Sequence, residues 1–220
     1  MKKIYGVKSI VPANKQLKNR RNLFSWFKHH KGAPAFWARS LTSGESITKS
    51  ELAFLNKNKC KILFVQQDLT QRIVTGKSAT KYVSQAISFA RRLGVDDTKT
   101  AIFAQINPEW RVNPRWMVSY VDGMIANGFI PGFICSEDVY NAINNIHVTD
   151  EISRWVRPIT DNSQVVFMLF APKSKKDDIP HQSKVALHIC GKVKFEGFET
   201  DIIEITDERI LEYLWLPQIE

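Results

Sequence analysis

The sequence predicts an α/β fold, most simply a (β/α)8 TIM-type barrel that is trimmed in its last third. Short apolar segments alternate regularly with segments of helical periodicity, which is the pattern of a parallel sheet covered by helices. Eight strand segments can be identified, and eight strands close such a barrel. The stretches 171–183 and 190–200 are polar and too short for ordinary crossover helices. An open doubly wound parallel sheet is the alternative.

The first part of the chain carries clear boundary signals. Gly32 stands where a helix over 22–32 should end, and Gly94 ends an amphipathic helix over 78–93. Thr48 and Glu51 form a capping box, T-x-x-E, that opens a further helix. These helices separate expected strands at 3–10, 34–41 and 61–69.

The later elements follow the same logic. Asn113 and Pro114 supply an N-cap and a first-turn proline for a helix that reaches about residue 127. Asp207 is the expected cap of a closing helix over 207–215. Further helices are expected near 137–146 and 150–156, and strands at 101–107, 129–136, 164–171, 184–190 and 201–205.

The positive charge of the chain is concentrated at one end. The chain has 31 Lys and Arg against 22 Asp and Glu, but residues 1–44 contain ten of the basic residues and no acid. A polyanion, including a nucleic acid, is therefore one class of partner that the region 1–44 would fit.

Composition and motifs argue against several other classes. A 220-residue chain with 44% hydrophobic residues predicts one domain over 1–220. The cysteines Cys60, Cys135 and Cys190 have no C-x-x-C spacing, and the histidines have no metal-ligand spacing, so no metal is expected. The stretch TGKSAT lacks the first glycine of a phosphate-binding loop, and no cofactor is expected.

The N-terminus indicates the compartment. It has no long apolar segment typical of a secretory signal, and no membrane span is expected. The cytoplasm is therefore the expected location, although a phage protein or one exported without a signal would look the same.

Polar side chains end the strand predicted at 101–107. Gln105 and Asn107 share one face of this strand, and Glu109 continues the alternation after Pro108, followed by Trp110. In a barrel of this type, ligands and substrates bind at the carboxyl ends of the strands. Two neutral amides thus stand where a hydrolase would usually carry carboxylates.

Five segments together resemble a known family. YGVKS (5–9), ARSLTSGESITKSE (38–51), AIFAQIN (101–107), GFICS (132–136) and TDIIE (200–204) follow the order of motifs in the Rv2525c-like, glycoside-hydrolase-like barrel domain of unknown function. That domain occurs in many bacterial cell-wall proteins and is related to the lysozyme-like family 25 glycoside hydrolases. The resemblance implies a TIM-type barrel that acts on, or binds, cell-wall glycan.

The departures from the family pattern bear on catalysis. The resemblance implies acids at the positions of Lys8, Gln105 and Asn107, whereas the last-strand acid remains as Asp201 and the second-strand arginine as Arg39. Glycoside hydrolysis needs two carboxyl groups, one of them a proton donor, and an amide cannot replace either. Because the first and eighth strands of a barrel are neighbours, Lys8 and Asp201 could pair, which would hold Asp201 ionised.

The sequence is therefore compatible with three functions. The first is binding of cell-wall glycan or a similar polar polymer with the catalytic acids lost, through Lys8, Arg39, Gln105, Asn107 and Trp110. The second is an active peptidoglycan-type glycoside hydrolase that uses Glu109 and Asp201. The third is nucleic-acid or polyanion binding through residues 1–44.

Overall fold

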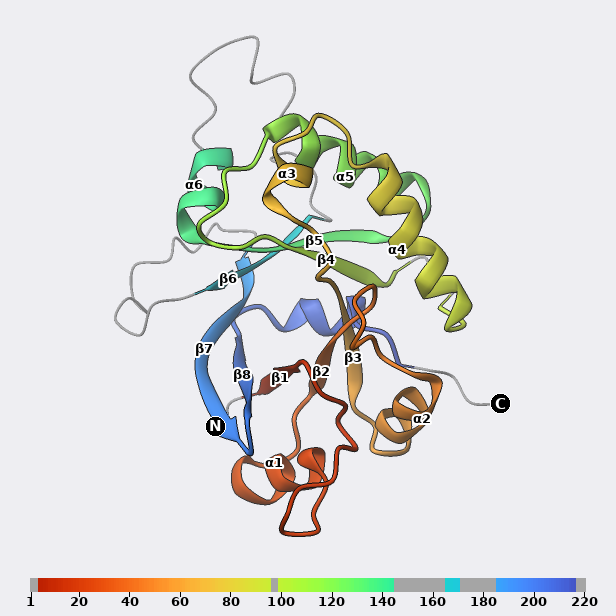
Figure 1. Ribbon diagram of the computed structural model, residues 1–220, viewed down its shortest axis with the longest axis vertical. Coiled ribbons are helices and arrows are strands. Elements are labelled where there is room, and N and C mark those ends of the chain that lie inside the picture. The colour runs from red at the N-terminus through yellow and green to blue at the C-terminus, as the bar shows by residue number, and fades with distance from the viewer. Residues whose placement is uncertain (1–3, 96–98, 145–164, 171–184, 217–220) are drawn as a thin grey trace.

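The eight predicted strands close into one barrel in sequence order (Figure 1). The computed structural model of the protein describes residues 4–95, 99–144, 165–170 and 185–216. Closure confirms the TIM-type barrel and excludes the open sheet. The strands are β1 Tyr5–Ser9, β2 Phe36–Ser40, β3 Lys61–Gln66, β4 Ala101–Gln105, β5 Ile130–Cys135, β6 Val166–Phe170, β7 Val185–Phe195 and β8 Phe198–Ile205.

The helices begin where the capping signals predict them. The Asn22 side chain accepts a hydrogen bond from the Ser25 N–H, and the Thr48 side chain accepts one from the Glu51 N–H. The short helix α3 was not predicted, and the closing helix is a 3-10 helix, η2. The helices are α1 Leu23–Lys31, α2 Lys49–Lys57, α3 Gln71–Val74, α4 Thr80–Arg92, α5 Pro114–Ala126, α6 Glu137–Asn144 and η2 Glu208–Tyr213. The helix expected near 150–156 lies outside the described residues.

The last strand runs in the opposite direction to the expected one. β8 pairs antiparallel with both β7 and β1, whereas the other neighbouring strands pair parallel. The reason is the connection, because only Glu196 and Gly197 separate β7 from β8 and Gly197 has a φ of 97°. A parallel crossover needs a dozen or more residues, so a two-residue connection can only form a hairpin. The expectation of an entirely parallel sheet is thus wrong for β8.

Two apolar cores lie on either side of the barrel wall. The interior is filled by side chains such as Phe36, Val65, Phe103 and Ile203, and the helices cover the outer face. Two glycines make room for interior rings. A Cβ on Gly6 would lie 2.1 Å from the Phe36 ring, and one on Gly132 would lie 2.6 Å from the Phe103 ring.

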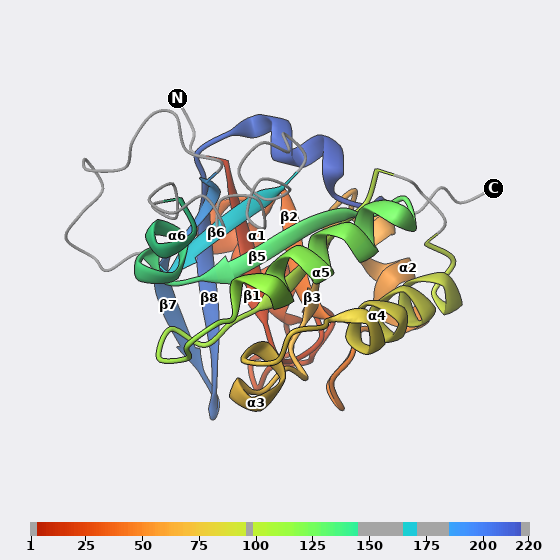
Figure 2. The same ribbon diagram turned by 90° about the horizontal axis from the view of Figure 1, so that it is seen from above.

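The two ends of the barrel differ. At the end where the parallel strands begin, η2 contributes Ile210 and Leu214 to the interior core, and Trp215 pairs with Ile62 of β3. Figure 2 shows η2 at one end, with α3 and the tip of the β7–β8 hairpin at the other. The strand-end face at this second end carries the loops that follow the parallel strands. Among the described residues, no helix is long and apolar enough to cross a membrane.

Candidate ligand-binding face at the strand ends

An ion pair between β1 and β8 lies at the mouth of the barrel. Lys8 and Asp201 are directly opposite in the strand register, and the Lys8 Nζ donates to the Asp201 Oδ2 at 3.0 Å. The two side chains are only 10% and 15% exposed, so water screens the pair weakly. The sequence-based expectation that these residues pair is confirmed. Antiparallel β8 brings them together, because its first residues then lie beside the last residues of β1.

An amide pair occupies the mouth between β3 and β4. The Gln67 Nε2 donates to the Gln105 Oε1 at 3.0 Å, and both side chains are half-buried. Gln105 thus lies at the strand-end face, as predicted. Gln67 follows β3 directly, at a strand end where polar site residues are expected, but it was not selected as a site residue. The pair presents neutral hydrogen-bond donors and acceptors at the mouth.

The segment after β4 turns away into solvent. The Asn107 Oδ1 accepts from the Glu109 N–H at 3.0 Å, and both residues are exposed. Trp110 is half-buried and packs against the outer core. Within the described chain, no hydrogen bond or ion pair joins the Glu109 carboxylate to Asp201. The two acids of the hydrolase alternative are therefore not brought into contact.

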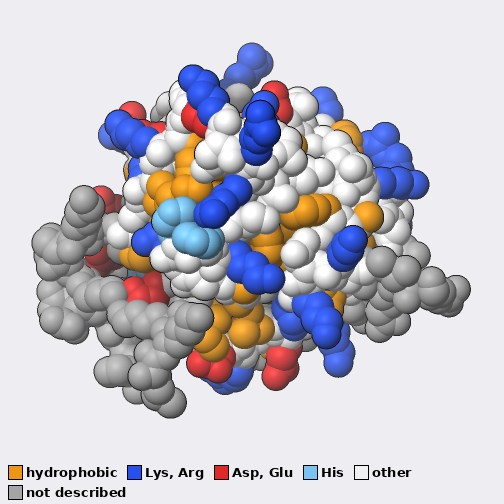
Figure 3. Space-filling view, turned by 90° about the horizontal axis from the view of Figure 1, so that it is seen from below, with side chains coloured by type: hydrophobic (Ala, Val, Ile, Leu, Met, Phe, Trp, Pro, Cys, Tyr) orange, Lys and Arg blue, Asp and Glu red, His pale blue; other side chains and the backbone are white. Residues whose placement is uncertain are grey.

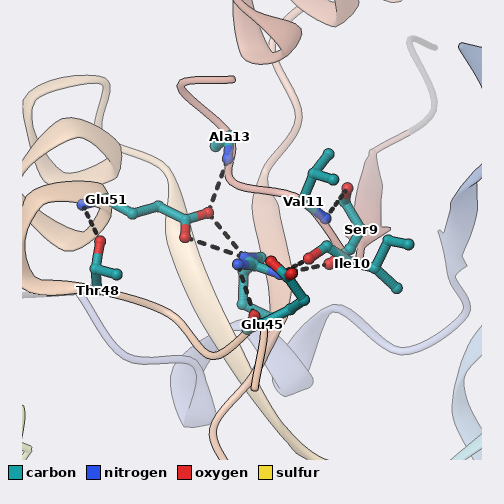
Figure 4. A network of polar contacts seen from close by, with 8 residues as sticks. Ser9, Ile10, Val11, Ala13, Glu45, Thr48 and Glu51 are labelled. Atoms are coloured by element: carbon teal, nitrogen blue, oxygen red, sulfur yellow. Dashed lines mark hydrogen bonds and ion pairs between the residues drawn. The ribbon is translucent and has the colours of Figure 1, made fainter. Parts of the chain in front are cut away.

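Arg39 has a different place from the predicted one, because it is part of a network with Ser9, Ile10, Glu45 and Glu51. Figure 4 shows these partner residues and the contacts of the network. Its side chain is 1% exposed, and its Nε lies 2.9 Å from the Oε1 of Glu51, which is fully buried. Its Nη1 donates to the carbonyls of Ser9 and Ile10, and its Nη2 donates to that of Glu45. Four of the five N–H donors of a guanidinium are thus used inside the protein. Arg39 lies behind the strand-end face and holds its loops together.

Glu51 completes this buried network. Its Oε1 also accepts from the Ala13 N–H at 2.8 Å, which ties α2 to the segment after β1. Burial raises the pKa of the Glu51 carboxyl, while the Arg39 charge and the Ala13 and Arg39 hydrogen bonds oppose the rise. The network therefore fixes the first loop of the strand-end face at the cost of burying two charges.

Hydroxyl groups and one further acid lie on the loops after β2 and β3. The Thr42 Oγ1 donates to the Asp68 Oδ1 at 2.6 Å, and the Ser43 Oγ donates to the Ser40 Oγ at 2.6 Å. Asp68 is half-buried and was not a predicted site residue. These groups extend the polar part of the face from β1 across to β4. Among the described residues, no cluster of His, Cys, Asp or Glu could hold a metal ion.

Two of the three thiols should be chemically inert. Burial raises the pKa of both Cys60 and Cys135 to about 12, so the reactive thiolate is very scarce at pH 8. We expect a thiol reagent to modify at most one cysteine, the half-exposed Cys190, in the folded protein at pH 8. All three should react after unfolding in denaturant. Rapid modification of two or three thiols in the folded protein would contradict this burial.

Comparison with known proteins finds similar structures but no similar sequence family. No family model matches the chain, and no curated protein matches it in sequence. An uncharacterized protein of B. stearothermophilus has a similar structure, with a TM-score of 0.74, 22% identity and coverage of 96% of this chain and 100% of that one. The Tat-secreted protein Rv2525c of Mycobacterium tuberculosis, in complex with HEPES, gives a TM-score of 0.62 at 15% identity, covering 92% and 95% of the two chains.

A lysozyme-related enzyme has the same architecture. The family 25 glycosyl hydrolase GHIP of Streptococcus pneumoniae gives a TM-score of 0.54 at 13% identity, covering 98% of this chain and 94% of that one. The identities are low, so they establish the shape of the barrel and leave its chemistry open. The chain therefore has the glycoside-hydrolase-like barrel fold that Rv2525c and the family 25 hydrolases share, as the resemblance in the sequence implied.

Proposed function

We propose that this protein binds a cell-wall glycan or a similar polar polymer at the strand-end face and does not hydrolyse it by the usual two-carboxylate mechanism. The observation that carries the proposal is the ion pair of Lys8 and Asp201, at 3.0 Å and largely buried. A lysine at this point of the mouth engages Asp201, the acid of β8 that lies directly opposite it.

The remaining groups support loss of the usual mechanism. Retaining and inverting glycosidases place two carboxyl groups about 5 to 9.5 Å apart around the scissile bond. Here Gln105 is hydrogen-bonded to Gln67, and Glu109 is exposed beyond the turn at Asn107. The Asp68 carboxylate accepts from Thr42 through one oxygen.

The same groups suit recognition of a sugar polymer. Amides, hydroxyls and a lysine ammonium match the hydroxyl-rich surface of a glycan, because each sugar hydroxyl both donates and accepts. The structural neighbours fit this ligand class, since they include a family 25 glycosyl hydrolase and the catalytic domain of an endolysin from a Listeria phage. Rv2525c forms complexes with HEPES and with L-tartrate, both polar organic anions. Because that neighbour is Tat-secreted, the fold does not tie this chain to the cytoplasm that its N-terminus predicts.

The test measures binding and cleavage on the same material. The protein is mixed with purified bacterial peptidoglycan, and both the bound fraction and the release of reducing sugar ends are followed. We expect the protein to sediment with the glycan and to release no reducing ends above background. Glu109→Gln should bind like the wild type, since Glu109 points into solvent.

Two results would overturn the proposal. Release of reducing ends that both Glu109→Gln and Asp201→Asn abolish would establish an active hydrolase that uses these two acids. Failure of the wild-type protein to sediment with peptidoglycan would exclude it as the ligand. Asp201→Asn also probes the ion pair, because the Lys8 ammonium then loses its charged partner in a largely buried place.

A further inference from the structure

The loop between β1 and α1 projects from the strand-end face. It starts at the carboxyl end of β1, where Arg39 and Glu51 hold its first residues. Gln16 and Asn22 form an isolated antiparallel bridge, and the Leu17 N–H donates to the Arg21 carbonyl at 2.9 Å. The buried Leu17 anchors the loop in the outer core. The loop over 10–22 is thus built and held by backbone hydrogen bonds, independently of its charged side chains.

This loop also meets the tip of the β7–β8 hairpin. The Lys18 N–H donates to the Oε1 of Glu196 at 2.7 Å, and Glu196 lies in the turn beyond the end of β7. Figure 1 shows this hairpin reaching down beside α1. The loop therefore borders the side of the mouth where β1 and β8 carry Lys8 and Asp201. The part of the basic region that lies in this loop therefore borders the proposed glycan site.

The loop carries exposed positive charge. Its four cations are all exposed, and none of them forms an ion pair within the part of the chain that the structure describes. Lys and Arg side chains also predominate over Asp and Glu on the side of the molecule that Figure 3 shows. The four cations of the loop are Lys15, Lys18, Arg20 and Arg21.

The aromatic side chains of α1 and the β7–β8 hairpin, which lie beside the loop, pack against one another. His30 stacks on Trp26 with ring centroids 4.1 Å apart, and Phe195 meets Trp26 edge-on at 4.8 Å. Phe195 in turn stacks with Phe198 at 5.4 Å. Binding of single-stranded nucleic acid relies on open aromatic faces on which bases stack, and these rings use their faces on one another. The surface therefore favours recognition of charge without base stacking.

We propose that the ligand is an anionic glycan polymer, in which repeating phosphate or carboxylate groups contact the loop while sugar hydroxyls contact the strand-end face. This inference rests on the proposed glycan binding and names its ligand class. The cations of the loop stand on a fixed backbone, so little further ordering is needed when a chain of anions binds. Binding should then combine a salt-dependent part from the loop with a salt-independent part from the mouth.

The test compares two pairs of substitutions on two forms of bacterial wall. One form retains its covalently attached phosphodiester polymer, and the other has been stripped of it by acid extraction. Arg20→Gln/Arg21→Gln removes two charges from the loop. Lys57→Gln/Lys59→Gln removes two exposed charges from the end of α2, at the opposite end of the barrel. The pairs are matched in backbone as well, because Arg20 and Lys59 both have positive φ, at 65° and 53°.

We expect weaker binding only for the Arg20 and Arg21 double variant, and only on the intact wall. At low salt, Arg20→Gln/Arg21→Gln should weaken binding to the intact wall about tenfold, because two exposed charged contacts are lost. Its binding to the stripped wall should equal that of the wild type, and Lys57→Gln/Lys59→Gln should change neither. Raising the salt should erase the tenfold difference.

Other outcomes separate the two proposals. Equal loss in both double variants would mean that overall charge, not the loop, attracts the wall, and no loss in either would refute the role of the loop. A short DNA duplex that binds as tightly as the intact wall, with the same tenfold loss, would assign the surface to nucleic acid. Failure of the wild type to bind the stripped wall would instead refute glycan binding at the mouth.

Discussion

Arg39→Met is expected to lower the free energy of unfolding by about 3 to 5 kcal/mol, the usual cost of removing one member of a buried ion pair. The substitution leaves the fully buried Glu51 carboxylate without its guanidinium partner. It also removes the donors to the carbonyls of Ser9, Ile10 and Glu45. Urea unfolding of the wild type and the variant, followed by circular dichroism, measures the difference.

The pH dependence of the unfolding free energy separates loss of the ion pair from loss of packing, because loss of packing alone would not depend on pH. Without Arg39, the pKa of Glu51 in the folded state should rise further, because the Arg39 charge is what lowers it most. An acid with a raised pKa in the folded state binds more protons folded than unfolded, so stability falls as pH rises from the unfolded pKa to the folded pKa. The variant should therefore recover stability on acidification toward pH 5, relative to the wild type at the same pH.

A double variant serves as the control. Arg39→Met/Glu51→Leu removes both charges, and well-packed apolar replacements of a buried pair are often neutral or stabilising. Its unfolding free energy should lie well above that of Arg39→Met, short of full recovery because three carbonyls and the Ala13 N–H still lack partners. A single variant as stable as the wild type, with no pH dependence, would show that Arg39 does not hold this loop.

Gly6→Ala is expected to destabilise the barrel by about 1 to 3 kcal/mol, the range for overpacking a filled core. The new methyl group would lie 2.1 to 2.5 Å from three atoms of the Phe36 ring, well inside van der Waals contact. Phe36 is fully buried inside the barrel, so its ring cannot swing into solvent. Thermal and urea unfolding check the size of the loss.

Two further variants test this explanation. Gly191→Ala is the matched control, because a Cβ there meets nothing within 4 Å, and its stability should stay within about 0.5 kcal/mol of the wild type. Gly6→Ala/Phe36→Leu removes the ring that the methyl group meets and should be more stable than expected from adding the two single effects. Strictly additive losses would mean that the contact with Phe36 is not the cause.

Much of the fold could be predicted because its signals are local. The capping residues Asn113 and Thr48 start helices where expected, since a cap needs only its own first turn. The helix α3 was missed because four residues are too few to show periodicity. The direction of β8 was missed because the strands predicted at 184–190 and 201–205 stop short of β7 and β8, which hides the two-residue connection of a hairpin.

The candidate site was predicted less completely. Strand alternation placed Gln105 correctly, because a side chain two residues from an interior one faces the same way. Arg39 was predicted to bind the ligand, and its burial with Glu51 depends on packing of α2 against the loop after β1. Gln67 and Asp68 stand at a strand end but were not selected as site residues, since the sequence does not show that they contact Gln105 and Thr42 on other loops and strands.

The sequence by itself determined the alternation of elements, the neutral amide at Gln105 and the presence of lysine at position 8. These follow from residue identity and short-range periodicity, which act within a few residues along the chain. Only the tertiary structure decided that Asp201 contacts Lys8, which lies 193 residues earlier in the chain. It also decided that Arg39 is buried against Glu51 and that the basic loop borders the mouth. Those facts depend on strand direction and register, which are set by contacts between distant segments when the barrel closes.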